Sequence, residues 1–155
     1  MPATKLKTFL DSQKVKYVSY KHSKAFTASE VAASTHVPGR EMAKTIMIKA
    51  DDKIVMVVLP APEFISMESV KYVTGAKDVH LAGEQEFKDL FPDCEVGAMP
   101  PFGNLYDLET YVDASLTEDT EIAFNAGTHT EIIKMAYEDF HKLVEPTVVH
   151  LALEV

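Results

Sequence analysis

Two apolar, β-branched segments lie in the centre of the chain, separated by three residues. Residues 45–49 (TIMIK) and 53–59 (KIVMVVL) flank Ala50, Asp51 and Asp52. Aspartates in a short gap between two such segments are typical of a hairpin turn, so the segments are predicted to pair as strands. The second segment is apolar at successive positions rather than at every other one. This pattern predicts a central strand that is covered on both faces.

Helical and strand-like segments follow one another irregularly along the rest of the chain. Hydrophobic spacing and capping residues predict helices at about 4–13, 27–34, 67–73, 84–90 and 137–143. Strands are predicted at about 15–20, 79–82, 110–112, 121–124 and 131–135, and residues 147–153 are either a strand or an oligomer contact. Because helices and strands do not alternate regularly, this order predicts an α+β fold with a mixed or largely antiparallel sheet in one domain, residues 1–155.

The composition is that of an ordinary globular domain. Hydrophobic residues make up 46% of the 155 residues and charged residues 25%, which suffices for a core without disulfides or metals. No segment is apolar over the roughly 20 residues that span a bilayer, and residues 1–7 lack the apolar core of a signal peptide. We therefore expect a cytoplasmic protein that does not bind membranes.

The formal charge of −9 is unevenly distributed. Residues 1–24 contain six lysines and one aspartate, a net charge of +5, so the remaining residues are strongly acidic. The acidity of the chain as a whole argues against broad, non-specific binding of nucleic acid. Two interpretations of the basic segment stay open: it presents one face to a phosphate backbone, or its lysines are ordinary solvated surface residues.

Several common catalytic and cofactor-binding motifs are absent. The chain has no dinucleotide-binding glycine motif, no P-loop, no G-x-S-x-G and no H-E-x-x-H. The six histidines never pair at i, i+4, so neither a metal nor a cofactor is expected. The single cysteine, Cys94, stands between Asp93 and Glu95, whose charges oppose a thiolate, and is predicted to be structural.

Three segments remain as candidates for a functional site. Lys44 begins the first apolar strand, where its ammonium suits a phosphate or a polarised carbonyl, or is simply an edge lysine. Residues 97–104 contain two glycines and two prolines, which form a rigid loop with amides for a ligand, or only a rigid turn. Residues 124–130 place polar side chains at one end of the sheet. There His129 can orient a ligand or move a proton, or is merely exposed.

In this order the three segments resemble the YbaK/prolyl-tRNA synthetase-associated domain family, whose members deacylate mischarged tRNA. The matching sequence features are Ala43-Lys44-Thr45-Ile46, the G-x-x-x-P loop at 97–101 with its continuation Pro101-Phe102-Gly103, and 124–129 (FNAGTH). The resemblance extends from about Tyr20 to Val144. It implies an α+β fold whose mixed, partly barrel-like sheet is surrounded by helices.

The resemblance also implies a free-standing enzyme that hydrolyses the ester between a wrong amino acid and the terminal adenosine of tRNA. Lys44 matches the family lysine that contacts this nucleotide and positions the ester. Such hydrolysis needs no protein nucleophile when a water and the vicinal ribose hydroxyl are held in line, with donors at the developing oxyanion. The other expected substrate-binding residues are Thr45, Gly97, Ala98, Met99, Pro100, Pro101, Gly103, Asn125, Gly127 and His129.

The expected partners are the acceptor end of tRNA and an aminoacyl-tRNA synthetase, and the protein itself is expected to be a monomer or weak homodimer. No charged residue lies between Gly97 and Gly103. If Met99 and its neighbours form a wall of the pocket, it should admit small or medium uncharged amino acids. Two alternative functions stay open: a module that binds tRNA ends or a nucleotide without turnover, and a small-molecule esterase unrelated to translation.

Overall fold

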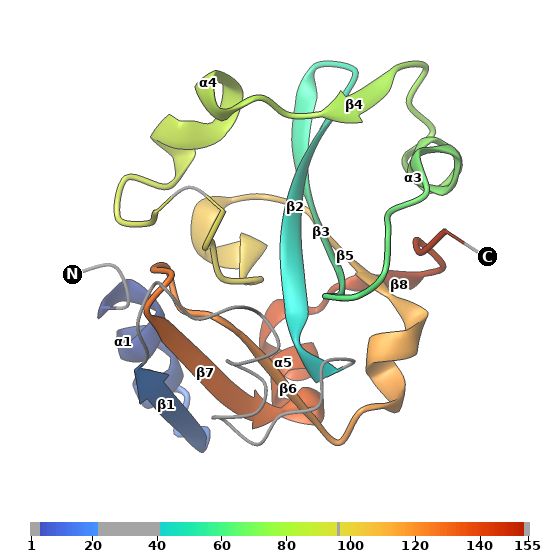
Figure 1. Cartoon of the computed structure of the whole chain (residues 1–155). Coiled ribbons are helices and arrows are strands. Elements are labelled where there is room, and N and C mark those ends of the chain that lie inside the picture. The colour runs from blue at the N-terminus through green and yellow to red at the C-terminus, as the bar shows by residue number, and fades with distance from the viewer. Residues whose placement is uncertain (1–3, 22–40, 96, 154–155) are drawn as a thin grey trace.

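The computed structural model describes residues 4–21, 41–95 and 97–153, and its strands form two sheets (Figure 1). The smaller, antiparallel sheet has the order β1 (Tyr17–Lys21), β7 (Glu131–Ala136) and β6 (Glu121–Asn125). The larger sheet has the order β4 (Val79–Leu81), β2 (Ala43–Ala50), β3 (Lys53–Pro60), β5 (Thr110–Asp113) and β8 (Thr147–Val149). It is mixed, because β5 runs parallel to β3 and β8 while β2 runs antiparallel to its neighbours. The predicted α+β class is confirmed, with two sheets rather than a closed barrel among the described strands.

The predicted hairpin and its buried second strand are confirmed. Strands β2 and β3 pair from Ala43 opposite Pro60 to Ala50 opposite Lys53. Side chains of β3 alternate between two hydrophobic clusters: Met56 and Val58 lie in one, and Val55, Val57 and Leu59 in the other. Because successive side chains of a strand point to opposite faces, both faces of β3 are packed, which accounts for its nearly continuous apolar sequence.

The helices match most of the predicted ranges. They are α1 (Thr4–Ser12), α3 (Met67–Thr74), α4 (Glu84–Phe87) and α5 (Tyr137–Val144). Helix α3 begins where the Ser66 hydroxyl accepts a hydrogen bond from the Ser69 amide and ends at Gly75, whose φ of 70° is readily adopted by glycine. The helix predicted at 84–90 is α4 followed by the 3₁₀ turn η2 (Lys88–Leu90). The helix predicted at 27–34 lies outside the described residues.

The aromatic residue of the predicted rigid loop is a central core residue. Phe102 is fully buried, and its ring centroid lies 6.2 Å from that of Phe9, 5.5 Å from that of Phe124 and 5.4 Å from that of Phe140. These partners come from α1, β6 and α5. Packing of the loop against all three elements therefore fixes it relative to the smaller sheet.

The carboxyl-terminal residues are held within the chain. The Asp113 carboxylate accepts hydrogen bonds from the amides of Leu151 (2.7 Å) and Ala152 (3.0 Å). On the other side of this tail, the Leu153 amide donates to the Phe64 carbonyl (2.6 Å), and Ile65 forms a bridge with Ala152. The segment predicted as a strand or an oligomer contact thus packs on its own chain and fixes the backbone around Phe64.

Glu131 ties α1 and β1 to β7. Its buried carboxylate accepts hydrogen bonds from the Ser19 hydroxyl and the Lys7 ammonium. Burial by itself raises the pKa of Glu131, but these two donors outweigh burial, and the pKa lies below its ordinary value. The ionised form is therefore favoured in the folded state, so it stabilises the fold above the unfolded-state pKa of about 4.3.

We expect the Glu131→Gln substitution to lower the free energy of unfolding at pH 7 by about 1–3 kcal/mol, the usual contribution of hydrogen bonds to a charged group. The difference from the wild type should shrink between pH 5 and pH 3, because the wild-type carboxylate becomes protonated as pH falls through its folded-state pKa. Urea unfolding at several pH values measures both effects. The control is Glu138→Gln, which removes an exposed ion pair with Lys142 and should change stability little. A difference that does not vary with pH would contradict this role.

Candidate functional site

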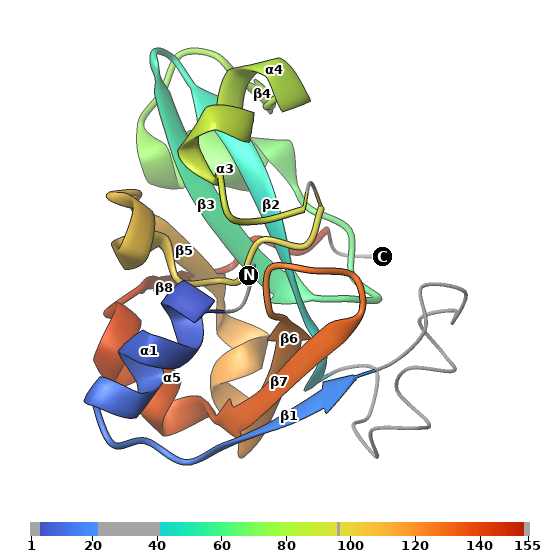
Figure 2. The same cartoon turned by 90° about the vertical axis from the view of Figure 1, so that its left-hand side faces the viewer.

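Two of the three predicted segments meet at one end of the smaller sheet, where Figure 2 shows the loop after residue 95 beside the β6–β7 turn. The Gly127 amide donates to the Ala98 carbonyl (2.9 Å), and the Glu95 amide donates to the Gly127 carbonyl (2.8 Å). The Thr128 hydroxyl also donates to the Glu95 carboxylate. Backbone and side-chain hydrogen bonds therefore hold the glycine–proline loop (residues 97–104) against the β6–β7 turn. The place where this loop meets the turn is the junction.

The imidazole of His129 lies on the side of Gly97 where a side chain would be. Gly97 has a φ of +85°, a conformation that disfavours any residue with a side chain. A Cβ added there would lie 3.4 Å from Cε1 and 3.5 Å from Nε2 of His129. Both residues are exposed, so a ligand at the surface can reach the glycine backbone and the imidazole together.

The start of β2 lies beside the middle of β6. Met42 forms an isolated parallel bridge with Ala123 of β6, and the two side chains pack together. Because side chains alternate along a strand, Lys44 shares the face of Met42, and Asn125 shares the face of Ala123. Lys44 therefore lies on the face of β2 that follows from Met42, and Asn125 lies on the face of β6 that carries Ala123, whereas Thr45 is on the opposite face of β2.

The ammonium of Lys44 is held beside the loop that follows β3. It donates a hydrogen bond to the Glu63 carbonyl and lies 5.7 Å from the centroid of the Phe64 ring. Burial lowers the pKa of Lys44, and the Glu63 carboxylate opposes this shift. An ammonium has three N–H donors, and the Glu63 carbonyl takes one of them. The arrangement provides a fixed positive charge suited to a phosphate or an oxyanion.

The predicted site residues fall into two groups by exposure. Lys44, Thr45 and Asn125 are partly exposed, and Gly97 and His129 are exposed. The buried members are Ala98, Met99, Pro100, Pro101, Gly103 and Gly127.

Burial changes the interpretation of the loop. The Met99 side chain, only 4% exposed, packs in the main core, so its effect on the choice of amino acid stays a prediction. A Cβ on Gly103 would lie 2.2 Å from Oγ1 of Thr110, which explains this glycine by packing. The buried residues thus support the loop from inside the molecule.

Comparison with known proteins identifies the family of this chain. Residues 22–143 match the family model of the aminoacyl-tRNA editing domain. The chain belongs to this family. The editing domain is 33% identical over 103 residues to a proline–tRNA ligase of Bacillus cereus (strain AH187) and to one of Bacillus mycoides (strain KBAB4). Each match covers 64% of this chain but 18% of the ligase, so the chain spans less than a fifth of the length of these relatives.

Solved structures show the same fold. A protein described as a candidate trans-editing enzyme for prolyl-tRNA synthetase superposes on the editing domain with a TM-score of 0.86 and 17% identity, over 99% of this chain and 98% of that one. A protein described only as hypothetical gives a TM-score of 0.84 and 20% identity, over 96% and 99% of the two chains. At these identities the likeness concerns the fold.

The sequence analysis did not identify Glu63, Phe64 or Glu95 as parts of the site region. Phe64 is 73% exposed although its backbone is fixed by the tail. Pro60 ends the buried strand that pairs with the Lys44 strand, and Pro62 follows it. These prolines were a usable signal in the sequence, because prolines stiffen a loop at the end of a strand. Glu95 gave no such signal, because its contact with Thr128 depends on the fold.

Cys94 of the editing domain has a structural environment, as predicted. Its half-buried Sγ lies 3.4 Å from the Tyr106 hydroxyl and 3.7 Å from the Asp93 carboxylate. Burial raises the pKa of the Cys94 thiol to about 11, so the thiol is protonated at neutral pH.

Two kinds of feature were not found in the part of the chain that the structure describes. Within residues 4–21, 41–95 and 97–153, no three histidine, cysteine or acidic residues gather as a metal site would require. Over the same residues, no helix has the length and apolar character needed to cross a membrane.

Proposed function

We propose that this editing domain is a trans-acting aminoacyl-tRNA deacylase, which hydrolyses the ester joining a wrong amino acid to the terminal adenosine of tRNA. The observation that carries the proposal is that, in a member of the editing family, the Gly97 loop is hydrogen-bonded to the β6–β7 turn and Met42, just before the Lys44 strand, bridges β6, the strand that leads into this turn. The likeness to a protein of nearly the same extent, described as trans-editing, supports action in trans. Such an enzyme works with an aminoacyl-tRNA synthetase in the cytoplasm.

In the proposed reaction a water molecule attacks the ester carbonyl carbon. The bond between that carbon and the ribose oxygen breaks, and the ribose oxygen takes a proton as the free amino acid leaves. The ammonium of Lys44 contacts the terminal nucleotide and positions the ester, while the exposed Gly97 and His129 bound the aminoacyl group. In this reaction water is the nucleophile, and positioned hydrogen-bond donors hold the ester and stabilise the developing oxyanion. The reaction therefore requires no catalytic triad, and the sequence has no motif for one.

Phe64 is suited to carry the adenine of this nucleotide. Its exposed ring stands beside the Lys44 ammonium, and its backbone is fixed by the Leu153 amide. Exposed aromatic rings stack on bases of any sequence. A base stacked on Phe64 brings the attached ribose and ester close to Lys44.

We expect Phe64→Ala to raise KM for aminoacyl-tRNA by roughly tenfold, since one base stack contributes about 1–3 kcal/mol, with a smaller change in kcat. Phe64→Trp should retain a KM near that of the wild type. Tyr72→Ala is the matched control, because Tyr72 is a 90% exposed aromatic residue on α3, and it should leave KM unchanged. Equal KM values for Phe64→Ala and Tyr72→Ala would exclude the stacking role.

Relative deacylation of alanyl-, seryl-, prolyl- and aspartyl-tRNA by the wild-type protein tests the proposed function and its specificity. Small uncharged amino acids should be released at overlapping rates, because apolar pockets discriminate by only about 10–200-fold per methylene. The aspartyl ester should persist, because its charge would go unpaired in the pocket. Fast release of aspartate would contradict an uncharged pocket, and release of none of the four would contradict the deacylase proposal for these substrates.

A further inference from the structure

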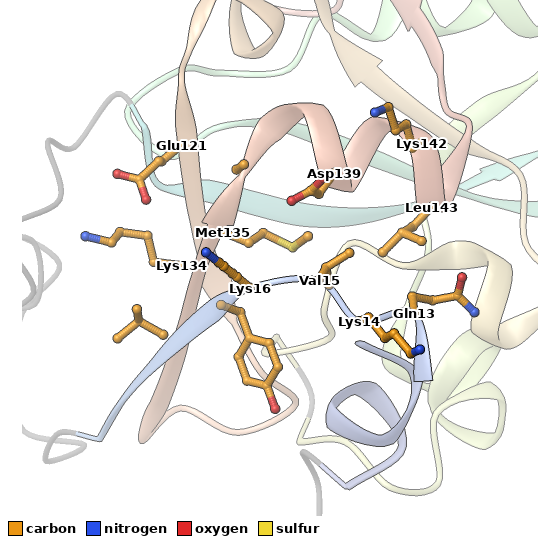
Figure 3. Close-up of a pocket in the computed structure, with 13 residues that line it drawn as sticks. Gln13, Lys14, Val15, Lys16, Glu121, Lys134, Met135, Asp139, Lys142 and Leu143 are labelled. Carbon is orange, nitrogen blue, oxygen red and sulfur yellow. The ribbon is translucent and has the colours of Figure 1, made fainter. Parts of the chain in front are cut away.

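A basic groove lies at the opposite end of the smaller sheet from the Gly97–His129 junction. Figure 3 shows this groove, a cavity of about 660 Å³ between the α1–β1 turn, β7 and α5. Four lysines line it: Lys14, Lys16, Lys134 and Lys142. Its two acidic residues are Glu121 and Asp139, so the lining carries net positive charge in a chain of net charge −9.

We propose that this basic groove binds the phosphate backbone of the tRNA acceptor stem. The inference rests on the proposed deacylase function and adds a second contact surface for the same substrate. Lysine ammonium groups bind phosphates as point charges, and phosphate contacts position an RNA without reading its sequence. A groove with four lysines in an acidic protein confines such contacts to one face.

The four lysines surround the groove rather than clustering on one side of it. Figure 3 shows Lys16 and Lys134 at one end and Lys14 and Lys142 at the other. Lys142 pairs with Glu138 at 3.3 Å, but both side chains are exposed, and such a pair is worth little in water. Its ammonium can therefore exchange this partner for a phosphate at small cost.

Part of the basic groove shares a face of the smaller sheet with the Met42–Ala123 bridge. Lys134 is two residues from Ile132, so both point to the same face, and Ile132 packs with Met42. Glu121, at the groove, and Asn125, at the junction, are the two ends of β6. Four residues of strand span about 13 Å. An RNA with its last nucleotide at the junction can thus run along this face to the groove.

The structure separates these lysines from others in the basic amino-terminal segment. Lys7 pairs with Glu131, and Lys5 lies 4.4 Å from the centroid of the Tyr106 ring. Lys21 does not line the groove. From the described part of this segment, only Lys14 and Lys16 contribute, and Lys134 and Lys142 come from the other end of the chain. The proposal therefore predicts which lysines affect RNA binding.

The test compares two variants of equal net charge. One replaces Lys14, Lys16, Lys134 and Lys142 with glutamine. The matched control replaces four exposed lysines elsewhere, Lys53, Lys71, Lys77 and Lys88. Binding of an acceptor-stem RNA hairpin to each full-length protein is measured by fluorescence anisotropy between 50 and 300 mM salt.

The groove variant should bind the hairpin at least tenfold more weakly at low salt, and its plot of log affinity against log salt should lose about 0.9 in slope for each phosphate contact removed. The control variant should keep a slope close to that of the wild type. Equal flattening in both variants would assign the effect to net charge, and no flattening in the groove variant would overturn the proposal. Hydrolysis of a short aminoacyl-adenosine by the wild-type protein tests the deacylase proposal separately.

Discussion

Replacing Lys44 with alanine is expected to slow ester hydrolysis by on the order of a hundredfold, the usual cost of removing one positioned donor from a reaction centre. The loss should appear in kcat and in kcat/KM, because the proposed role of the ammonium is to position the reacting ester. The fold should persist, since Lys44 is only partly buried and its described hydrogen bond is to the Glu63 carbonyl. Single-turnover deacylation and thermal unfolding measure the two effects.

Lys49→Ala is the matched control for this substitution. Lys49 is a partly exposed lysine on the same strand and lies opposite Ile54 and His80, away from Glu63. Its replacement should change the rate by less than about twofold, as expected of a surface residue outside the site. A folded Lys44→Ala protein as active as the Lys49→Ala protein would remove Lys44 from the reaction.

Gly103→Ala is expected to destabilise the protein by at least about 3 kcal/mol, at the upper end of the usual cost of overpacking. The added Cβ would lie 2.2 Å from Oγ1 of Thr110 and 2.7 Å from the carbonyl oxygen of Leu108. Thr110 is buried in β5, and the Leu108 carbonyl belongs to the backbone, so relief requires the loop itself to move.

Chemical unfolding measures this effect, with Gly83→Ala as the control. A Cβ at Gly83 meets no atom within 4 Å, and Gly83 has a φ of −75° at the start of α4, so the cost should stay below about 1 kcal/mol. If Gly103→Ala were as stable as the wild type but inactive, this glycine would serve ligand approach rather than packing.

The central hairpin was predictable because its determinants are local. Two β-branched segments around Asp51 and Asp52 define both strands, and the continuous apolar pattern of 53–59 places the second strand between two clusters. Helices α3 and α5 were predictable for the same reason, since spacing and end residues lie within each segment. A strand or helix that is determined by its own residues forms in the folded protein unless tertiary packing favours another conformation.

Features that depend on distant residues were not predictable. In the sequence, Phe102 is an aromatic residue in a predicted loop. In the structure, its ring packs against aromatic rings of α1, β6 and α5. The lysines of the basic groove come from both ends of the chain, so counting charge along the sequence could not group them. The bridge between Met42 and Ala123 determines which side chains of β2 lie on the same side of the strands as Asn125. The sequence does not show this bridge.

The candidate site lies between these two cases. Its three segments were identified by residue type, because glycines, prolines and an isolated lysine stand out from their surroundings. The approach of His129 to Gly97 and the hydrogen bond from Thr128 to Glu95 are visible only in the tertiary structure. Residue type therefore indicated the candidate segments, and the fold showed which parts of them lie next to one another.

The rate at which alanine is released from alanyl-tRNA, with and without the protein, tests the central claim most directly. A deacylase releases the amino acid many times faster than spontaneous hydrolysis and turns over more than one equivalent of tRNA. A module that only binds the aminoacylated end leaves the rate unchanged or slows it, because the ester is shielded from water. Multiple turnovers by the wild type that are lost in Lys44→Ala are the predicted result. Protection of the ester by a protein that binds the tRNA would contradict the account.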